Sequence, residues 1–280
     1  MPAKPSFDAL PLRKDGPHGN AWGLFGEDDQ LGMLNLLTPE TTINAAREII
    51  DGTRVSTDLP IGRVSKPFWG RPALHHTIKK WEPVTINDDV VTFNTQSSTQ
   101  WDGFRHFAYQ KEKLFFGGKT QEDFYTSKVN GTHNWVEGGG IVGRGVLLDW
   151  ASWADAKGIK FDPFTSVSIS VKDLKEVAAS QGTTFKDGDI LFIRSGWLRA
   201  VNKLTDDEWS ALADQPDPLA SASSNQRRRS GGFGITTLPP PLEIKSAWKR
   251  GRAKTWTTIS MNGSLLDGAC RLASCLIRKD

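Results

Sequence analysis

Residues 93–107 read F-N-T-Q-S-S-T-Q-W-D-G-F-R-H-F and directly follow a strand-like run, V-V-T, at residues 90–92. Four polar residues alternate in this stretch and would share one face of a strand: Gln96, Ser98, Gln100 and Asp102. Burying amides and a carboxylate in a row is costly unless they line a site or bind something. His106 follows Gly103, so we expect it just after a turn, where its imidazole can reach Asp102. The stretch therefore favours a functional site over a polar outer strand face with an isolated histidine.

The same stretch resembles the signature of the cyclase family, whose best-known members are bacterial-type kynurenine formamidases. That signature runs His-x-Gly-Thr-His-x-Asp-x-x-x-His, in which two histidines and the aspartate bind metal and the last histidine is catalytic. Gln96 and Gln100 stand at the two metal-histidine positions, whereas Thr99, Asp102 and His106 match the signature. A version with two glutamines resembles the fungal branch of the family.

The resemblance implies a role for each of these side chains. His106 and Asp102 would be catalytic, with His106 as general acid or base and Asp102 orienting it or binding metal. A metal would be held by Gln96, Gln100 and Asp102. Neutral amide oxygens are poorer zinc ligands than imidazole, so we expect a divalent ion (zinc or manganese) to be weakly bound or absent.

Aromatic residues are dense in this half of the chain, and we expect most in the core and some in an apolar pocket. The set is Trp69, Trp81, Trp101, Phe104, Phe115, Phe116 and Trp135. Of these, we expect Trp69, Trp101 and Phe104 to contact a substrate. His75 and His76 are adjacent, so on a strand they point to opposite faces and form a poor chelating pair. We expect both on the surface or in a substrate loop.

Start and stop signals predict the elements of the first part of the chain. Thr38 and Pro39 predict a helix start, and Gly52 predicts its end. We expect a strand over residues 54–60 and a loop over residues 64–81. The helix would bury an apolar stripe of Ile43, Ala46, Ile49 and Ile50.

Apolar runs and caps predict the elements of the later part. A buried strand ends at Asp149, which we expect to cap a helix over residues 150–157. Residues 171–180 predict another helix, and residues 190–194 a second buried strand. The inward side chains of the helix over 171–180 would be Leu174 and Val177.

Alternating helices and strands predict an α/β domain. Four strings, at residues 20–40, 93–107, 135–149 and 182–197, resemble the cyclase family, and the family implies a mixed sheet with flanking helices in a swivelling β/β/α fold. We therefore expect an N-terminal arm (1–19), a cyclase-like α/β domain (20–219) and a poorly ordered basic tail (220–280). Family members usually form homo-oligomers, so we expect one here, with loops such as 64–81 reaching a neighbour.

The composition is that of a soluble globular protein, because 38% of the 280 residues are hydrophobic and 24% are charged. No apolar run approaches the roughly 20 residues needed to span a bilayer, so we expect no membrane partner. The first residues, M-P-A-K-P-S-F-D, lack the basic and then apolar order of a secretory signal. These features predict a cytoplasmic protein.

Residues 220–280 differ in composition from the rest of the chain. They hold 11 Lys and Arg against 3 Asp and Glu, both cysteines, and no Val, His or Tyr. A basic tail can bind nucleic acid or an anionic membrane. The arginine run at 227–229 has no accompanying motif or interleaved aromatics, so we expect no nucleic-acid partner. Family members instead continue into a closing helix that supplies a His and a Glu to the site.

The genetic code offers a second interpretation of this tail, besides divergence or disorder. If each codon is rebuilt from the last base of one tail codon and the first two of the next, Met261 and Asn262 force a Glu. The codon choices open to residues 260–277 then allow a string that begins His-Glu-Trp-Leu-Leu-Ala-Gly-Trp. Residues 231–240 likewise allow Trp-Leu-Trp-Asp-Asn-His. Both strings resemble the missing family helices, which favours a tail translated out of frame.

The sequence supports two functions of different classes. The first is a cyclase-like hydrolase or lyase that opens or forms an amide or lactone of a small aromatic or polyketide-type metabolite, in fungal secondary metabolism. The second is a non-catalytic binding protein that keeps the scaffold and a pocket. Gln96, Gln100 and the absent tail histidine favour this second function.

The shifted-frame interpretation predicts a difference in solubility and activity. Losing the segment that closes the sheet exposes apolar surface. The free energy lost can exceed a domain's whole stability of roughly 5–15 kcal/mol. We therefore expect the chain as given to be poorly soluble or inactive, and a version with one base inserted or deleted near the codon for Leu219 to recover both. Soluble yield, activity and protease resistance measure this; equal results for both versions, with the tail protected, contradict the interpretation.

Overall fold

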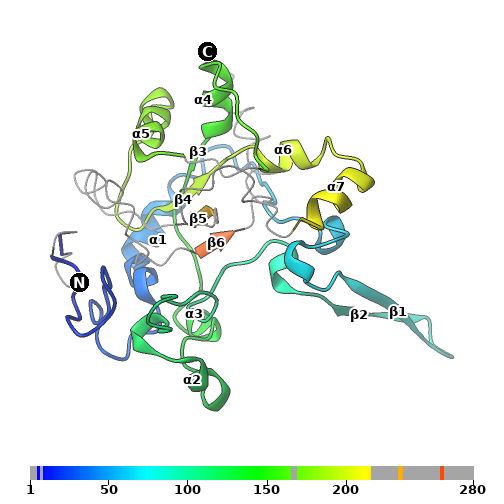
Figure 1. The fold of residues 1–280 in the computed structure, drawn as a ribbon, viewed down its shortest axis with the longest axis horizontal. Helices are drawn as coiled ribbons and strands as arrows, with labels where there is room; N and C mark the ends of the chain where they lie inside the picture. Colours follow the sequence, from blue (N-terminus) through cyan, green and yellow to red (C-terminus); the bar gives the residue numbers. More distant parts are fainter. Residues whose placement is uncertain (1–4, 7–8, 165–168, 216–232, 236–258, 262–280) are drawn as a thin grey trace.

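Two short parallel strands run side by side at the centre of the fold (Figure 1). Strand β3 (Gly145–Leu148) pairs with strand β4 (Ile190–Ile193), and Val146 lies opposite Leu191. Both strands are continuous apolar runs, which is typical of strands covered on both faces. The computed structural model describes residues 5–6, 9–164, 169–215, 233–235 and 259–261 of the chain.

The side chains of β4 alternate between two hydrophobic clusters, one on each face of the strand pair. Leu191 and Ile193 belong to the first cluster, which also contains the inward side chains of β3. Ile190 belongs to the second cluster, and Phe192 packs against it. The other buried members of the second cluster are Leu34, Phe104 and Trp135. The strand pair therefore divides the core into two halves, and residues near the predicted site belong to the second half.

Two helices supply buried side chains to the first cluster. Helix α4 (Trp150–Ala156) begins at Asp149, whose carboxylate accepts a hydrogen bond of 3.0 Å from the backbone nitrogen of Ser152, as the sequence predicts. Helix α5 (Val171–Ser180) begins with a capping box. The buried side chains of α5 include the two predicted ones, Leu174 and Val177.

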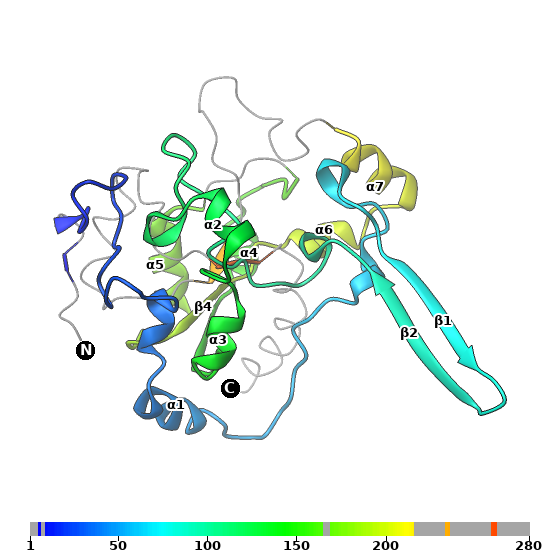
Figure 2. The same cartoon turned by 90° about the horizontal axis from the view of Figure 1, so that it is seen from below.

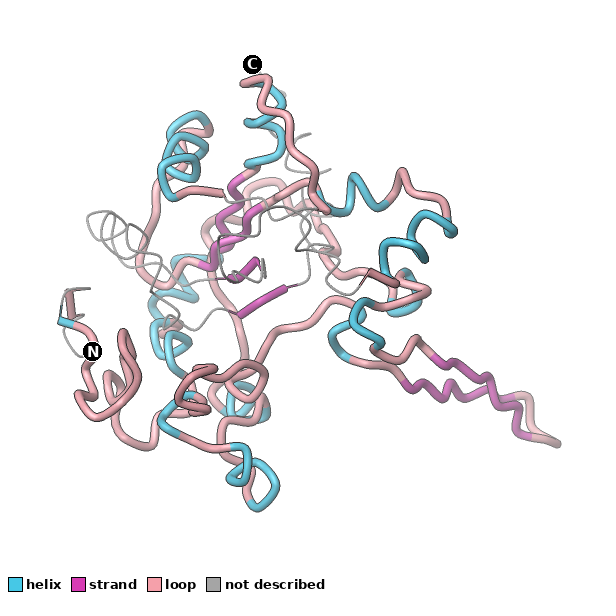
Figure 3. Tube along the Cα trace, viewed as in Figure 1, coloured by secondary structure: helices cyan, strands magenta, loops and turns pink. Residues whose placement is uncertain are grey.

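The strands do not form the single mixed sheet that the sequence predicts. Each strand has one hydrogen-bonded neighbour among the described residues, so the fold contains three two-stranded sheets: parallel β3–β4 and antiparallel β1–β2 and β5–β6 (Figure 3). The other strands are β1 (His75–Trp81), β2 (Ile86–Thr92), β5 (Phe233–Ile235) and β6 (Ile259–Met261). The other α-helices are α1 (Pro39–Ala46), α2 (Gln121–Thr126), α3 (His133–Glu137), α6 (Trp197–Val201) and α7 (Asp206–Ala213). Short 3₁₀ helices are η2 (Gly32–Leu36), η3 (Ile61–Arg63), η4 (Phe68–Gly70), η5 (Thr95–Ser97) and η6 (Phe116–Gly118).

Strands β1 and β2 form a long hairpin that projects from the body of the molecule (Figures 1 and 2). Every residue of both strands is exposed. The prediction of a loop over residues 64–81 is therefore wrong for β1, because the partner that orders β1 is β2, which lies later in the chain. His75 and His76 lie on the surface, as predicted.

Helix α1 is shorter than its sequence pattern predicts. Thr38 caps it as expected and accepts a hydrogen bond of 3.2 Å from the backbone nitrogen of Thr41. The helix ends at Ala46 instead of reaching Gly52, because the next backbone hydrogen bonds run to the third preceding residue and tighten the turn. The isoleucines of the predicted apolar stripe are exposed instead of buried: Ile43 in the helix, and Ile49 and Ile50 after its end.

The strand predicted over residues 54–60 is also absent from the described chain. Within the described residues this segment pairs with no strand. Side-chain hydrogen bonds take the place of the backbone hydrogen bonds that a paired strand would make. The backbone nitrogen of Leu59 donates to Thr99 Oγ1 at 2.8 Å, and Ser98 Oγ donates to the Leu59 carbonyl at 3.1 Å. The segment is thereby fixed against the polar stretch that the sequence singles out.

Most of the predicted tail, residues 220–280, lies outside the described residues, and so does the arginine run at 227–229. The described parts of the tail are β5 and β6, and the backbone of β5 lies beside β4. Within the described ranges, no helix combines the length and the apolar character needed to cross a membrane.

A buried ion pair joins the start of β3 to the start of β4. Arg144 donates to both carboxylate oxygens of Asp189, at 2.9 and 3.1 Å, and to the carbonyl of Thr184 at 3.1 Å. The Asp189 side chain is 2% exposed, and its negative charge is paired with this guanidinium. Arg144 also lies 3.1 Å from Glu48, whose pKa is lowered by a hydrogen bond from Lys186 and by the charge of Arg144. The pair therefore ties the segment after α1 to the strand pair.

Replacing Arg144 by methionine should destabilise the fold strongly. The change leaves Asp189 buried without its cation, which costs about 3–5 kcal/mol. The control is Lys172→Met in α5, which removes an exposed pair with Glu176 at 3.8 Å and should cost about 0–1 kcal/mol. Urea unfolding gives both free energies, and equal losses for the two variants would contradict the importance of the buried pair.

Candidate functional site

Asp102 and His106 lie side by side at the edge of the second core cluster. His106 Nε2 is 3.8 Å from Asp102 Oδ2, which is an ion-pair distance and too long for a hydrogen bond. The Asp102 side chain is 5% exposed and that of His106 is 36% exposed. The carboxylate is thus buried behind an imidazole that solvent and small molecules can reach.

Gln96 occupies the other oxygen of the buried carboxylate. Its amide nitrogen donates a short hydrogen bond to Asp102 Oδ1. Gln96 lies on η5 instead of a strand, because the Asn94 side chain accepts a hydrogen bond of 2.9 Å from the Gln96 backbone nitrogen and starts a helical turn. The predicted strand face over residues 96–102 is therefore not formed, yet its polar side chains still meet.

The amide of Gln100 lies next to that of Gln96, at 3.2 Å. One orientation turns the Gln100 nitrogen toward Gln96 and, at 3.5 Å, toward Asp102, but its oxygen then faces the carbonyl oxygens of Thr95 and Ser98. The opposite orientation lets the nitrogen donate to both carbonyls, at 2.9 Å for Thr95, and turns the Gln100 oxygen toward Gln96 Oε1, at 3.2 Å, and toward Asp102. In this orientation Gln100 holds its own loop through its nitrogen, and its oxygen faces the oxygens of Gln96 and Asp102.

A tight turn carries His106. The His106 backbone nitrogen donates to the Gly103 carbonyl at 2.9 Å. Position 103 has no room for a side chain, because a Cβ there would lie 2.8 Å from the methyl group of Thr132. Arg105 fixes the turn from outside, with hydrogen bonds of 2.7 and 3.0 Å to the carbonyls of Val129 and Ser127. The position of the imidazole is therefore set by backbone packing on the segment before α3.

The three aromatic residues predicted to bind substrate lie in different surroundings. Phe104 is buried and stacks on Phe116 with ring centroids 4.1 Å apart, so its ring is part of the core. Trp101 packs against the same cluster and is partly buried. Trp69 is 48% exposed, so it is the most accessible of the three. Trp81 lies on the projecting hairpin, outside this group.

Trp69 has an uncommon backbone conformation. Its φ of 59° lies in the left-handed region, which costs an L-residue roughly 1–2 kcal/mol, and Gly70 follows with φ of 66°. The turn brings the guanidinium of Arg71 over the Trp69 ring, with Cζ 4.8 Å from the centroid.

Arg71 is a site residue that the sequence does not point to. Burial lowers the pKa of its guanidinium, and the nearby Asp102 carboxylate opposes that change. Arg71 therefore belongs to the same electrostatic environment as the Asp102–His106 pair. A lone arginine in a loop carries no local motif, and Arg71 approaches Asp102 only through the fold.

The donor atoms around Asp102 differ from those of a closed zinc site. Gln96 points its amide nitrogen at Asp102 Oδ1. An amide N–H donates a hydrogen bond and cannot coordinate a cation. The Gln100 oxygen faces Gln96 and Asp102 but is neutral, so Asp102 is the anionic ligand of the three. Within the described residues no group of three His, Cys, Asp or Glu side chains could hold a metal ion. A closed zinc site takes four such donors.

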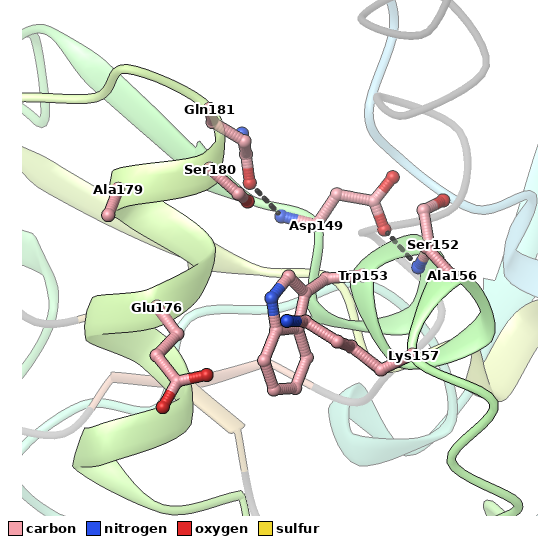
Figure 4. A pocket seen from close by; sticks show the side chains of 9 residues that line it. All are labelled: Asp149, Ser152, Trp153, Ala156, Lys157, Glu176, Ala179, Ser180 and Gln181. Atoms are coloured by element: carbon pink, nitrogen blue, oxygen red, sulfur yellow. Dashed lines mark hydrogen bonds between the residues drawn. The ribbon is translucent and has the colours of Figure 1, made fainter.

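A separate groove, whose lining does not include Asp102, lies between α4 and α5 (Figure 4). Its floor is Gln181, which accepts from the backbone nitrogen of Asp149 and donates to the carbonyl of Leu147, both at 2.9 Å. The groove holds Lys157 and Glu176 but none of the site residues above. Its polar groups serve to join α5 to β3, so we assign it a structural role.

Comparison with known proteins gives two matches. A family model described as "Putative cyclase" matches residues 49–227. A solved structure described as the crystal structure of a novel cyclase is similar with a TM-score of 0.60 and 28% sequence identity. That match covers 69% of this chain and 66% of the other, so it spans slightly less than two thirds of that protein. No curated protein matches the chain.

Replacing Gln96 and Gln100 together by histidine should create metal affinity. Two imidazole nitrogens beside Asp102 provide the ligand types that zinc prefers, so we expect zinc affinity to rise by roughly tenfold or more. Calorimetric zinc titration measures this, with Gln110→His in the exposed loop as the control. Stoichiometric zinc that survives chelator dialysis in the unchanged protein would show that its amides already suffice.

Proposed function

The chain belongs to the cyclase family, and from this premise we propose that it is a hydrolase acting on an amide or lactone of a small aromatic or polyketide-type metabolite. The swivelling β/β/α arrangement and a place in secondary metabolism are part of the same proposal. The observation that carries it is the pairing of Asp102, which is buried, with His106, which is partly exposed. General acid–base chemistry needs a titratable group within reach of substrate and a partner that fixes its orientation.

The chemistry assigned to His106 is proton transfer. Nε2 faces Asp102, so Nδ1 is left for water or substrate. His106 takes a proton from water as the water oxygen bonds to the carbonyl carbon. It then returns the proton to the leaving nitrogen or oxygen as the carbon–nitrogen or carbon–oxygen bond breaks. Asp102 stabilises the imidazolium between these steps.

No step of this proposal passes through a metal. The Gln96 nitrogen holds one oxygen of Asp102, and the amides of Gln96 and Gln100 are neutral. We propose that zinc or manganese, if bound, is held weakly by Gln96, Gln100 and Asp102. Trp69 offers an exposed ring for an aromatic substrate, while Trp101 and Phe104 act by fixing Asp102 between them.

We further propose that the protein is a homo-oligomer that uses the β1–β2 hairpin. A two-stranded hairpin exposed on both faces is marginally stable alone, and this one presents Trp81, Ile86 and Val90 on one face. Within one arm Lys80 pairs with Glu82 and Asp89 pairs with His76, so the apolar face is what a second arm would cover. The occupant that fits is therefore a second copy of this chain.

The alternative is a binding protein that has lost the chemistry. The specific observation in its favour is that amides stand where the family signature has metal-binding histidines, at Gln96 and Gln100. The two functions differ in turnover, since both bind a small molecule but only the enzyme needs His106 to transfer a proton.

Replacing His106 by alanine should lower turnover by about 10²–10⁴-fold, because general acid–base catalysis contributes that much. Hydrolysis of an aromatic lactone, dihydrocoumarin, and an aromatic formamide, formanilide, is the measurement. His75→Ala, on the exposed hairpin, is the control and should keep full activity. If His106→Ala turns over substrate as fast as the unchanged protein, His106 is not part of the mechanism. If the unchanged protein binds a ligand but turns over neither substrate, the alternative of a binding protein is favoured.

A further inference from the structure

The guanidinium of Arg71 has donors that the described protein does not use. It stacks on Trp69, and among the described residues its side chain makes no hydrogen bond or ion pair. By contrast Arg105, which is also partly buried, donates to two carbonyls. We propose that Arg71 and Trp69 form a subsite for the carboxylate of a small aromatic substrate, beside the Asp102–His106 pair. This inference rests on the proposed function and names its substrate class.

The chemistry of a stacked arginine suits a carboxylate. Stacking on an aromatic ring covers the face of the guanidinium and leaves its N–H edges free. Those edges form a planar fork that matches the two oxygens of a carboxylate. A partly buried cation with unused donors is unfavourable until an anion takes them, so the subsite favours a charged ligand over a neutral one.

The loop that carries Arg71 is fixed before any ligand binds. Phe68 packs on Trp209 of α7 with ring centroids 4.9 Å apart. Trp209 is buried, and its Nε1 donates to the carbonyl of Lys66 at 3.0 Å. The Lys66 ammonium lies 2.6 Å from Asp214, at the end of the same helix. Helix α7 thus holds the loop at Lys66 and at Phe68. The loop therefore loses little conformational freedom when a ligand binds.

The position of Arg71 relative to Asp102 sets the arrangement of the ligand. The guanidinium lies near the Asp102 carboxylate without pairing with it, and burial lowers its pKa more than that carboxylate raises it. An arginine stays protonated under these conditions. We place the ligand carboxylate on Arg71 and its ring against the exposed part of Trp69, with the carbonyl to be hydrolysed toward Asp102 and His106.

Binding of benzoate to the full-length protein tests the subsite, with benzamide as the uncharged ligand of the same shape. We expect benzoate to bind more tightly than benzamide. Arg71→Gln should weaken the affinity for benzoate by about 10- to 100-fold, because a charge-assisted bidentate pair is lost. The affinity for benzamide should not change. Arg71→Lys should give an intermediate affinity, because it keeps the charge without the fork. Arg54→Gln, at an exposed arginine, is the control and should bind as the unchanged protein does.

The measurements are calorimetry and tryptophan fluorescence, with circular dichroism to show that each variant is folded. Benzoate affinity that is the same in the unchanged protein and in both Arg71 variants would overturn the subsite. So would a folded protein that binds no benzoate. His106→Ala should still bind benzoate, so its loss of turnover reports on the proposed function alone. Benzoate binding that depends on Arg71, in a protein that hydrolyses neither test substrate, would support the subsite and contradict the proposed hydrolase function.

Discussion

The candidate site depends on the packing of Trp101 and Phe104 against the core cluster that contains Ile190 of β4. These two aromatic residues flank Asp102 in the chain, so burying their rings forces the carboxylate between them out of water. Burying a charge is costly unless donors and opposite charge compensate it. The Gln96 amide and the field of Arg71 supply that compensation. Apolar packing therefore fixes where the polar chemistry takes place.

Local signals in the sequence predicted the elements around β3 and β4 well. Asp149 caps α4, residues 171–180 form α5, and the apolar run at 190–193 forms a strand, because each depends on neighbouring residues. Signals that depend on a distant partner failed. Residues 54–60 have a strand-like sequence, but the partners of Leu59 are side-chain oxygens at Ser98 and Thr99.

The site shows the same division between local and distant information. The approach of His106 to Asp102 could be predicted, since a four-residue separation across a turn at Gly103 brings the two side chains together. Arg71 could not, because it reaches Asp102 from a loop that α7 positions, and α7 lies more than 100 residues later. The contact of Gly103 with Thr132 is likewise invisible in a single sequence. Periodicity describes one element, whereas a site is assembled from several.

The two glutamines change the electrostatics of the site as well as its ligands. In the family signature, histidines at these positions hold a cation against the aspartate. Here the amides are neutral, Gln96 gives Asp102 a hydrogen bond, and the cation whose charge acts on that carboxylate is Arg71. A guanidinium is fixed by covalent attachment and cannot polarise a carbonyl as a Lewis acid does, but it recognises anions with two hydrogen bonds. In the function that we propose, glutamines in place of histidines shift the balance of this site from binding metal toward binding an anionic substrate, with His106 as the group that moves protons.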